Sequence, residues 1–247
     1  MNTHSTYDMR FTGSLWTTVC QPLARSVRPT GADEGEGWEL TLTSYRLVAA
    51  VRPAPFRRSR YRWCMSTALL TDMYELTMVD SAIASGTAGR RSVFEVFARR
   101  LPGERRYGVV AGTGRVVEAV RDFRFGPEEI AYLESAGIVS ERTLEWMEGY
   151  RFTGDVYGYA EGECYFPHSP VLTVLGTFAE ACVLETVILS ILNHDSAVAT
   201  AASRMTAAAH GRPCVEFGAR RTHEVAAVHS ARAAVIAGFE ATSDLEA

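Results

Sequence analysis

Two polar segments in the last third of the sequence carry side chains that could bind an anion. Gly218-Ala219-Arg220-Arg221 follows an apolar run at 214–217, and Thr242-Ser243-Asp244 closes a second run that begins at Phe239. A guanidinium group grips a carboxylate or a phosphate through two parallel hydrogen bonds, and a glycine lets a ligand approach the backbone closely. These residue types predict a binding site for a negatively charged group, or else a surface arginine pair on an unrelated loop.

The residues between these segments predict the unit that positions them. Residues 222–237 are rich in alanine and valine and end at Gly238, which is typical of a helix. A strand, a helix and a strand within about 30 residues form a βαβ unit with parallel strands and a right-handed crossover. Because ligands bind beyond the carboxyl ends of parallel strands, we expect both polar segments on one side of a sheet. Strand 214–217 should be buried.

Hydrophobic periodicity predicts mixed helices and strands from Met65 onward. Thr71 or Asp72 should cap the first helix, Pro127 should open another, and Ser140 should cap a third. Residues 178–209 should form a long helix that is interrupted near Asn193-His194-Asp195. The other expected elements are a helix over 114–123, strands over 93–97 and 171–175, and two short strands within 155–166.

Lysine is absent from the sequence, so all 25 basic residues are arginine, and the net charge is −4. This absence excludes a Schiff-base lysine and the lysine of a phosphate-binding P-loop. Codon bias from a GC-rich genome is the simplest explanation. The arginines form no stripe that alternates with aromatic residues, so nucleic-acid binding has little support. Any anion that the chain binds must be held by arginine or by backbone N–H groups.

Cysteine spacing and the lack of targeting signals indicate a cytoplasmic protein. No apolar run approaches the ~18 residues of a transmembrane helix, and the N-terminus lacks the apolar core of a signal peptide. We expect no membrane association. Five cysteines without a Cys-x-x-Cys motif predict reduced, mostly buried thiols rather than a disulfide framework or a zinc site: Cys20, Cys64, Cys164, Cys182 and Cys214.

Residues 1–64 differ in composition from the rest of the chain. Arginine, proline, glycine, serine and threonine dominate, and the apolar residues follow neither a helical nor a strand period. We expect this segment to be disordered or a mis-called extension, with Met65 as the natural start. The alternative is a functional basic tail.

From Met65 onward the sequence resembles nicotinate phosphoribosyltransferases, the family that makes nicotinate mononucleotide for NAD synthesis. No single segment is diagnostic, but together and in this order they are specific. The Asn193-His194-Asp195-Ser196 variant and the arginine bias suggest an actinobacterial member, present here as its N-terminal portion. The matching segments are 70–78 (LTDMYELTM), 94–102 (FEVFARRLP), 107–112 (YGVVAG), 152–157 (FTGDVY), Glu185-Thr186 with Asn193 and Ser196, 216–221 (EFGARR) and 238–243 (GFEATS).

The resemblance implies an α/β (α+β) fold and a reaction. Residues 65–175 would form an N-terminal α+β domain, and residues 176–247 the first strands and helices of an irregular, incomplete α/β barrel. Family members work as dimers and join nicotinate to 5-phosphoribosyl 1-diphosphate, with ATP hydrolysis and Mg²⁺. Positive charge develops on the ribose and negative charge on the leaving pyrophosphate, which cationic groups would stabilise.

The resemblance also implies roles for residues of this chain. Tyr74, supplied by the partner subunit, would stack on one face of the pyridine ring and Phe217 on the other. The alternatives are that Tyr74 is an ordinary helix residue and that Phe217 belongs to the core. Arg220 would face the nicotinate or the ribosyl phosphate with Arg221 beside it, Thr242 and Ser243 would lie near the ribose and phosphate, and Arg99 and Arg100 are weaker candidates for binding the diphosphate.

Two departures limit what the resemblance implies. The phosphohistidine loop of the family would lie beyond Ala247, so we expect no catalytic residue and no metal ligand in this chain, and no role for His223 or His229. Asp244 stands where the family usually has asparagine. Glu161 and Glu163 suggest a carboxylate pair, but they flank a turn, so we expect both side chains to be solvated. The alternative function is that of an inactive fragment or pseudoenzyme that only pairs with intact subunits.

Overall fold

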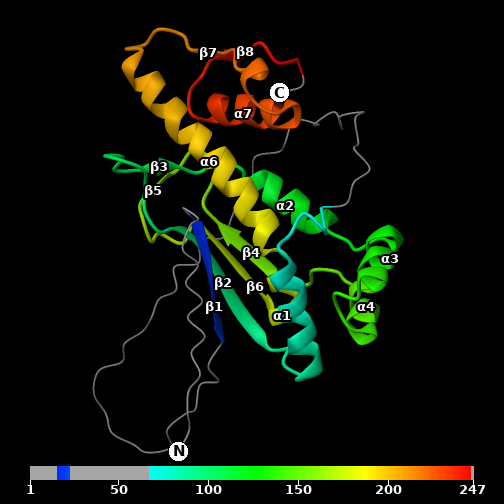
Figure 1. Cartoon of the computed structure of the whole chain (residues 1–247). Coiled ribbons are helices and arrows are strands. Elements are labelled where there is room, and N and C mark those ends of the chain that lie inside the picture. The colour runs from blue at the N-terminus through cyan, green and yellow to red at the C-terminus, as the bar shows by residue number, and fades with distance from the viewer. Residues whose placement is uncertain (1–15, 23–66, 246–247) are drawn as a thin grey trace, which may run out of the picture.

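The computed structural model describes residues 16–22 and 67–245, and within them a four-stranded antiparallel sheet forms the centre of the fold (Figure 1). Alternate residues of the second strand are buried, because successive side chains of a strand point to opposite faces. The expected strands over 93–97 and 171–175 are therefore confirmed. The strand order is β1 (Trp16–Pro22), β2 (Arg91–Ala98), β6 (Leu172–Thr177) and β4 (Asp155–Gly158).

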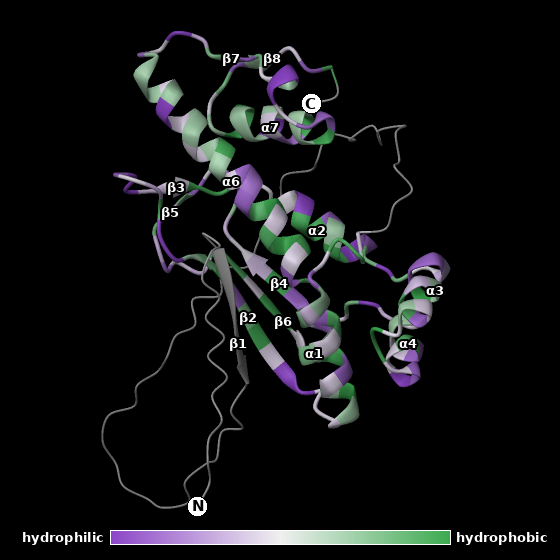
Figure 2. Cartoon of the chain, viewed as in Figure 1, coloured by the Kyte–Doolittle hydropathy of each residue, from purple (hydrophilic) through white to green (hydrophobic). Residues whose placement is uncertain are grey.

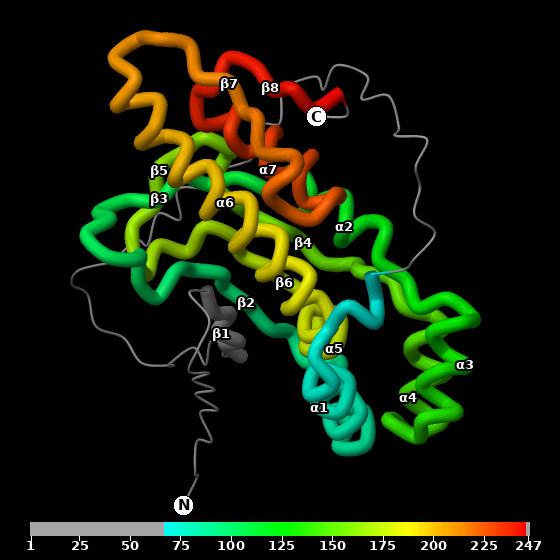
Figure 3. Tube along the Cα trace, turned by 45° about the horizontal axis from the view of Figure 1, so that its top comes forward, coloured from blue at the N-terminus to red at the C-terminus, as the bar shows by residue number. Residues whose placement is uncertain are grey.

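Helices cover one face of this sheet. The long helix α6 (Glu185–Ala208) runs over it, with α1 (Met73–Ala84) and the short α5 (Phe178–Cys182) beside its N-terminal end (Figures 1 and 3). Asp72 is the N-cap of α1, as expected, although its side chain makes no capping hydrogen bond. One hydrophobic core joins the sheet to these helices, through residues such as Phe94, Val96, Leu172, Leu76 and Leu192.

Three further helices confirm the start signals in the sequence. They are α2 (Thr113–Asp122), α3 (Pro127–Ala136) and α4 (Glu141–Glu148), and α3 has proline at its first position. Ser140 is the N-cap of α4, but its hydroxyl donates to Asp80 Oδ1 of α1 at 2.5 Å instead of capping its own helix. This contact ties α4 to α1.

The C-terminal residues form the predicted βαβ unit. β7 (Val215–Glu216) and β8 (Ala241–Thr242) pair in parallel, and α7 (Glu224–Ile236) connects them and packs on α6 (Figure 3). The expectation that strand 214–217 is buried is wrong, since Val215 is 55% exposed and Phe217 is 71% exposed. Two strands shield less surface than a full sheet does, so side chains of β7 keep their contact with solvent.

The two short strands expected within 155–166 are present but lie in different sheets. β4 pairs with β6, whereas β5 (Cys164–Tyr165) pairs with β3 (Gly108–Val109). The ring of Tyr165 lies directly against Gly108, where a Cβ atom would overlap it. Glycine at position 108 is therefore required by this packing.

The interruption of the long helical segment was predicted at the wrong place. The break falls at Val183-Leu184, between α5 and α6, and Asn193-His194-Asp195 is helical. A polar side chain disturbs a helix when it competes for backbone hydrogen bonds. Asp195 does not compete, because its carboxylate is bound by Arg115 and His194.

Trp16–Pro22 differ from the expectation for residues 1–64. They form β1, which pairs with β2 from Trp16↔Ala98 to Pro22↔Ser92, so the prediction of disorder is wrong for these seven residues. An edge strand offers unpaired main-chain groups that a further strand can satisfy. The rest of this segment lies outside the described residues.

The helical stretch Phe178–Ala208 is long and apolar enough to cross a membrane, with a mean hydropathy of 1.3 over its most apolar 18 residues. From the sequence we expect no apolar run of this length. The two results differ because a mean hydropathy over 18 residues can be high even where polar residues interrupt the apolar run. Of that window, 56% is buried inside the protein, as in the core helix of a folded domain (Figure 2).

The described cysteines are free thiols, and they are less buried than expected. Cys182 is buried, whereas Cys214 is partly exposed and Cys164 is exposed. The side chains of Cys20 and Cys64 lie outside the described residues. Burial was overestimated because Cys164 lies on the short strand β5 and Cys214 directly precedes the short strand β7, both at the surface of the fold.

Candidate functional site

The predicted anion-binding segments meet at the carboxyl end of β7. Ser243 donates its N–H to the Glu216 carbonyl oxygen at 3.0 Å, and the Thr242 hydroxyl donates to Glu216 Oε2 at 2.8 Å. The N–H of Gly218 donates to the other carboxylate oxygen of Glu216. Parallel pairing of the two strands thus places both segments on one side, as expected. Glu216, which joins them, has no signal in the sequence beyond its place in the strand.

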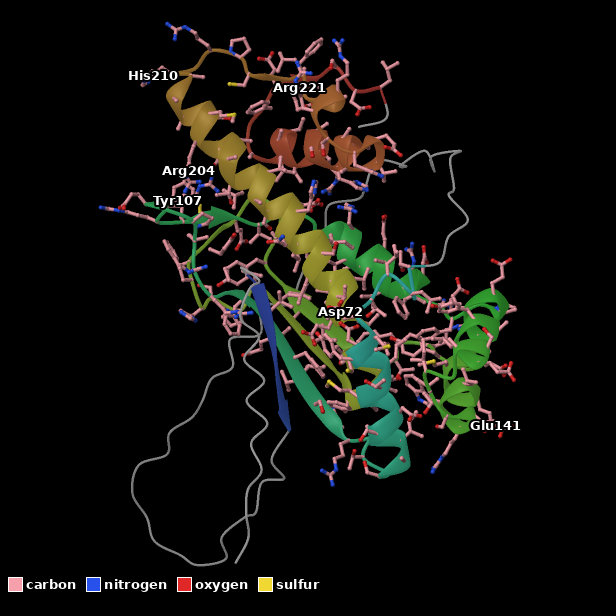
Figure 4. The ribbon with its side chains drawn as sticks, viewed as in Figure 1. Asp72, Tyr107, Glu141, Arg204, His210 and Arg221 are labelled. Carbon is pink, nitrogen blue, oxygen red and sulfur yellow. The ribbon has the colours of Figure 1, made fainter. Side chains whose placement is uncertain are left out.

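The arginine pair lies on a single 3₁₀ turn, η1 (Ala219–Arg221), which begins two residues after the exposed Phe217; Arg221 is labelled in Figure 4. The turn closes through the N–H of Arg221, which donates to the Gly218 carbonyl oxygen at 2.7 Å. Both arginine side chains are exposed, and neither makes an ion pair with another described side chain. Their guanidinium groups can therefore meet an anionic ligand without first breaking a salt bridge.

Tyr74 lies in a different region of the chain. It belongs to the first turn of α1, where burial and then the charge of Glu185, the first residue of α6, raise the pKa of Tyr74. Arg221 lies beyond the C-terminal half of α6, as the positions of Asp72 and Arg221 show (Figure 4). A helix of 24 residues spans about 36 Å, so one chain does not bring Tyr74 and Phe217 to the same ligand.

Two buried carboxylates accompany Tyr74. Glu75 is fully buried and accepts hydrogen bonds from the N–H of Thr186 at 3.0 Å and from its hydroxyl at 2.5 Å. The hydroxyl of Thr71 also donates to Glu75. Burial raises the pKa of Glu75, and burial together with the Glu75 charge raises the pKa of Glu185 to about 7. In the sequence Glu75 is only one residue of the matching segment 70–78, and nothing there predicts its burial.

The weaker phosphate candidates, Arg99 and Arg100, directly follow β2. The side chain of Arg100 is exposed and that of Arg99 is partly buried. A nearby open cavity of about 660 Å³ does not include them, since its walls are residues 102–107 and Arg204. Arg204 lies 4.5 Å above the Tyr107 ring and donates to the Tyr107 carbonyl oxygen at 2.8 Å (Figure 4).

The expectation that Glu161 is solvated is wrong, because its side chain is partly buried and bound by hydrogen-bond donors. Its carboxylate accepts two hydrogen bonds from Arg232 of α7, at 2.9 Å from Nη1 and 2.5 Å from Nη2, and a third from the N–H of Gly112 at 2.6 Å. Burial would raise the pKa of Glu161, but Arg232 and the N–H groups at the start of α2 hold that pKa below its usual value. Glu163, two residues further on, is exposed as expected.

A second polar network connects α2, α6 and α7. Asp195 is 1% exposed and accepts hydrogen bonds from Arg115 at 2.8 Å and from His194 Nδ1 at 2.9 Å. His194 Nε2 lies 3.4 Å from the hydroxyl of Ser230. This order of hydroxyl, imidazole and carboxylate is that of a nucleophilic triad. Ser230 lies inside α7, however, where helical N–H groups are already bonded, so no backbone oxyanion hole accompanies it.

The two histidines for which no role is expected, His223 and His229, lie on or next to α7. His223 is the exposed N-cap of that helix and accepts from the N–H of Val225 at 3.3 Å. His229 is partly buried, and burial with the nearby Arg115 charge lowers the pKa of His229 to about 4. Among residues 67–245, no three His, Cys, Asp or Glu side chains are grouped to hold a metal ion.

Comparison with known proteins identifies relatives of this chain. Residues 69–193 match the model of the nicotinate phosphoribosyltransferase (NAPRTase) N-terminal domain. A nicotinate phosphoribosyltransferase of Mycobacterium tuberculosis is 59% identical over 179 residues, which are 72% of this chain and 40% of that protein. The enzyme of the same name from Bacillus subtilis is 37% identical over 183 residues, 74% of this chain and 37% of that protein.

A solved structure resembles the fold. The crystal structure of human nicotinic acid phosphoribosyltransferase superposes with a TM-score of 0.66 at 27% identity, covering 71% of this chain and 36% of the human chain. The mixed helix and strand fold expected from the sequence is confirmed by this match. The chain spans about 40% of the length of the relatives it matches.

Proposed function

The chain belongs to the nicotinate phosphoribosyltransferase family, and from that premise we propose that it takes part in the synthesis of nicotinate mononucleotide for NAD. The pyridine nitrogen of nicotinate forms a bond to C1 of 5-phosphoribosyl 1-diphosphate. The bond from C1 to the diphosphate oxygen breaks, and its electron pair leaves with pyrophosphate. Both substrates are anions, and one is a flat aromatic ring.

The observation that carries this proposal is the juxtaposition at the end of β7. Phe217 presents an exposed ring, and three residues later η1 carries two exposed guanidinium groups that make no ion pair with a described side chain. An aromatic face suits a flat heterocycle, and arginine suits a carboxylate or a phosphate. Arg220 would bind the nicotinate carboxylate or the ribosyl phosphate with Arg221 beside it, and Thr242 and Ser243 would lie at the ribose and its phosphate.

The separation of Tyr74 from Phe217 supports a homodimer as part of the proposal. If both rings enclose one pyridine, they must come from two subunits, because α6 keeps them apart in one chain. Arg99 and Arg100 would bind the diphosphate. We place the protein in the cytoplasm, since the exposed free thiol of Cys164 suits a reducing compartment.

ATP and Mg²⁺ enter the proposal from the family. Mg²⁺ would offset the charge of the diphosphate, and ATP hydrolysis would drive the synthesis. The described residues include no group of three metal-binding side chains. What these residues contribute is binding and orientation of the two organic substrates.

The test is an assay of the purified chain with nicotinate, 5-phosphoribosyl 1-diphosphate, ATP and Mg²⁺, with nicotinate mononucleotide measured by mass spectrometry. Binding of nicotinate and of 5-phosphoribosyl 1-diphosphate is measured in parallel by calorimetry. We expect binding of at least one substrate, weakened by Arg220→Ala and unchanged by Arg212→Ala, whose side chain is exposed on another loop. Absence of both binding and product would overturn the proposal.

The second candidate function is an inactive fragment that pairs with intact subunits. It is favoured by the coverage of about 40% of each relative. Mixing the chain with an intact homologue and measuring mass by light scattering separates the two. A mixed complex without substrate binding by the chain alone supports the second candidate.

A further inference from the structure

Glu216 connects the two polar segments at the end of β7 through both of its carboxylate oxygens. Oε1 accepts the N–H of Gly218, the residue before the arginine turn η1, and Oε2 accepts the hydroxyl of Thr242 at 2.8 Å. The hydroxyl oxygen of Thr242 in turn accepts the N–H of Asp244 at 3.0 Å. A continuous line of hydrogen bonds therefore runs from the arginine turn to the residues that follow β8.

The pairing of β7 with β8 restrains these segments only weakly by itself. The two strands pair over two residues each, and Ser243 adds one backbone hydrogen bond, from its N–H to the Glu216 carbonyl oxygen at 3.0 Å. Val215 and Phe217, on either side of Glu216, are 55% and 71% exposed, so their side chains pack against few neighbours. The Glu216 carboxylate thus adds a connection between the strands at the point where their pairing ends.

The charge of Glu216 is unfavourable in a site for anions. Glu216 makes no ion pair with a described side chain, and a carboxylate so close in sequence to Arg220 and Arg221 repels an anionic ligand. What the carboxylate offers instead is two strong acceptors for two different donors. Charge and positioning therefore predict opposite effects. Loss of the charge should strengthen anion binding, whereas loss of the hydrogen bonds should weaken it.

Thr242 and Ser243 differ in what they can offer to a ligand. The Thr242 hydroxyl has a single proton and donates it to Glu216. Ser243 is exposed, and its hydroxyl makes no hydrogen bond with another described residue. The proton of the Ser243 hydroxyl is therefore available to a ligand oxygen, whereas that of Thr242 is already used within the protein.

We propose that Glu216 is a positioning residue, which fixes the arginine turn against Thr242 and leaves the hydroxyl of Ser243 to bind a phosphate group of the ligand. The Glu216 carboxylate does not contact that ligand and acts through Gly218 and Thr242. The inference rests on the proposed function for the identity of the ligand, 5-phosphoribosyl 1-diphosphate. The hydrogen bonds of Glu216 do not depend on that identity.

The test compares variants of the full chain. Glu216→Ala removes both acceptors, and Glu216→Gln keeps a neutral side chain of the same length. Glu240→Ala is the matched control, because it removes an equal charge from an exposed residue directly before β8. Thr242→Val and Ser243→Ala separate the two hydroxyls. The readouts are binding of 5-phosphoribosyl 1-diphosphate by calorimetry and the amide resonance of Gly218, assigned by its loss in Gly218→Ala. Unfolding by urea shows that each variant is folded.

Glu216→Ala should raise the dissociation constant about five- to tenfold, whereas Glu216→Gln should keep it within about twofold and Glu240→Ala should not raise it. Thr242→Val should raise it by a similar factor, with no further increase when it is combined with Glu216→Ala. The Gly218 amide proton should shift upfield in Glu216→Ala, because it loses a charged acceptor. Ser243→Ala should weaken binding and leave that resonance in place.

Three results overturn the inference. The first is an unchanged Gly218 resonance in Glu216→Ala, and the second is an affinity that is unchanged or increased in that variant. The third is full additivity of Glu216→Ala and Thr242→Val, since the Thr242 hydroxyl would then act on the ligand directly. If the unaltered chain binds no 5-phosphoribosyl 1-diphosphate, the proposed function fails instead. The Gly218 resonance then decides alone whether Glu216 holds the arginine turn, so the two failures are distinguishable.

Discussion

The guanidinium of Arg232 lies against the carboxylate of Glu161, with Nη1 and Nη2 at 2.9 and 2.5 Å from its two oxygens. Glu161 belongs to the turn after β4, and Arg232 to α7 of the C-terminal unit. The same carboxylate accepts the N–H of Gly112 at the start of α2. One carboxylate therefore joins the βαβ unit that carries Arg220 to the rest of the fold.

Removing this ion pair should destabilise the protein. Glu161→Gln leaves Arg232 without its charged partner and should lower the free energy of unfolding by about 1–3 kcal/mol, measured by urea denaturation. Glu163→Gln is the matched control, because Glu163 is exposed two residues away. Equal stability losses in the two variants would contradict the structure.

The free energy of unfolding should decrease as the pH rises through the titration of Glu185. Its pKa of about 7 in the folded chain exceeds its unfolded value of 4.5, so the folded state holds this proton more tightly. The resulting stabilisation is complete below pH 4.5 and is lost as the pH rises through 7. The pKa values of Asp80, Glu161 and Asp195 are lowered in the folded protein. The stabilisation that these three carboxylates give to the folded protein is therefore lost as the pH falls below about 4.

Urea unfolding of the chain and of Glu185→Gln at pH 5, 6, 7 and 8 measures this effect. We expect the unaltered chain to lose roughly 2 kcal/mol over this range relative to Glu185→Gln, which cannot titrate. Parallel pH profiles of the two proteins would show that Glu185 titrates normally.

Gly108 should tolerate no side chain. In Gly108→Ala the new Cβ meets the ring of Tyr165, which is 3% exposed and cannot move into solvent. We expect a loss of at least about 1–3 kcal/mol, visible as a lower Tm in calorimetry. Gly89→Ala is the control, since a Cβ there meets nothing within 4 Å. A comparable drop in both variants would sink this account.

Phe217 should contribute to binding and not to stability. Because its ring is 71% exposed, Phe217→Ala should change the free energy of unfolding by less than about 0.5 kcal/mol. If the ring stacks on nicotinate, the same change should weaken nicotinate binding about fivefold or more in calorimetry. Val215→Ala is the control, since Val215 is 55% exposed on β7, two residues before Phe217. A large loss of stability in Phe217→Ala would instead place this ring in a core.

Local features could be predicted because they depend on neighbours in sequence. Asp72, Pro127 and Ser140 begin helices where expected, since caps and proline act on the first turn that follows them. The parallel pairing of β7 and β8 also follows from local facts, namely the lengths of two strands and the helix between them. The ordered family segments carried the rest of the identification.

Two wrong predictions, the helix break near Asn193-His194-Asp195 and the solvation of Glu161, have a different origin. Both errors concern carboxylates whose partners lie far along the chain. Asp195 stays helical because Arg115 of α2 binds it, and Glu161 is partly buried because Arg232 of α7 reaches it. No local pattern contains such partners, so a polar residue read alone appears to belong in solvent or at a break.

The sequence by itself determined the family, the helix starts and the residue types at the end of β7. Tertiary structure alone decided that Thr186 binds Glu75, that burial beside Glu75 raises the pKa of Glu185, and that Asp72 and Arg221 lie near opposite ends of α6 (Figure 4). The physical reason is distance along the chain. Dihedral preferences and caps act within a few residues, whereas hydrogen bonds and burial between α1, α6 and α7 depend on how these helices pack on the sheet.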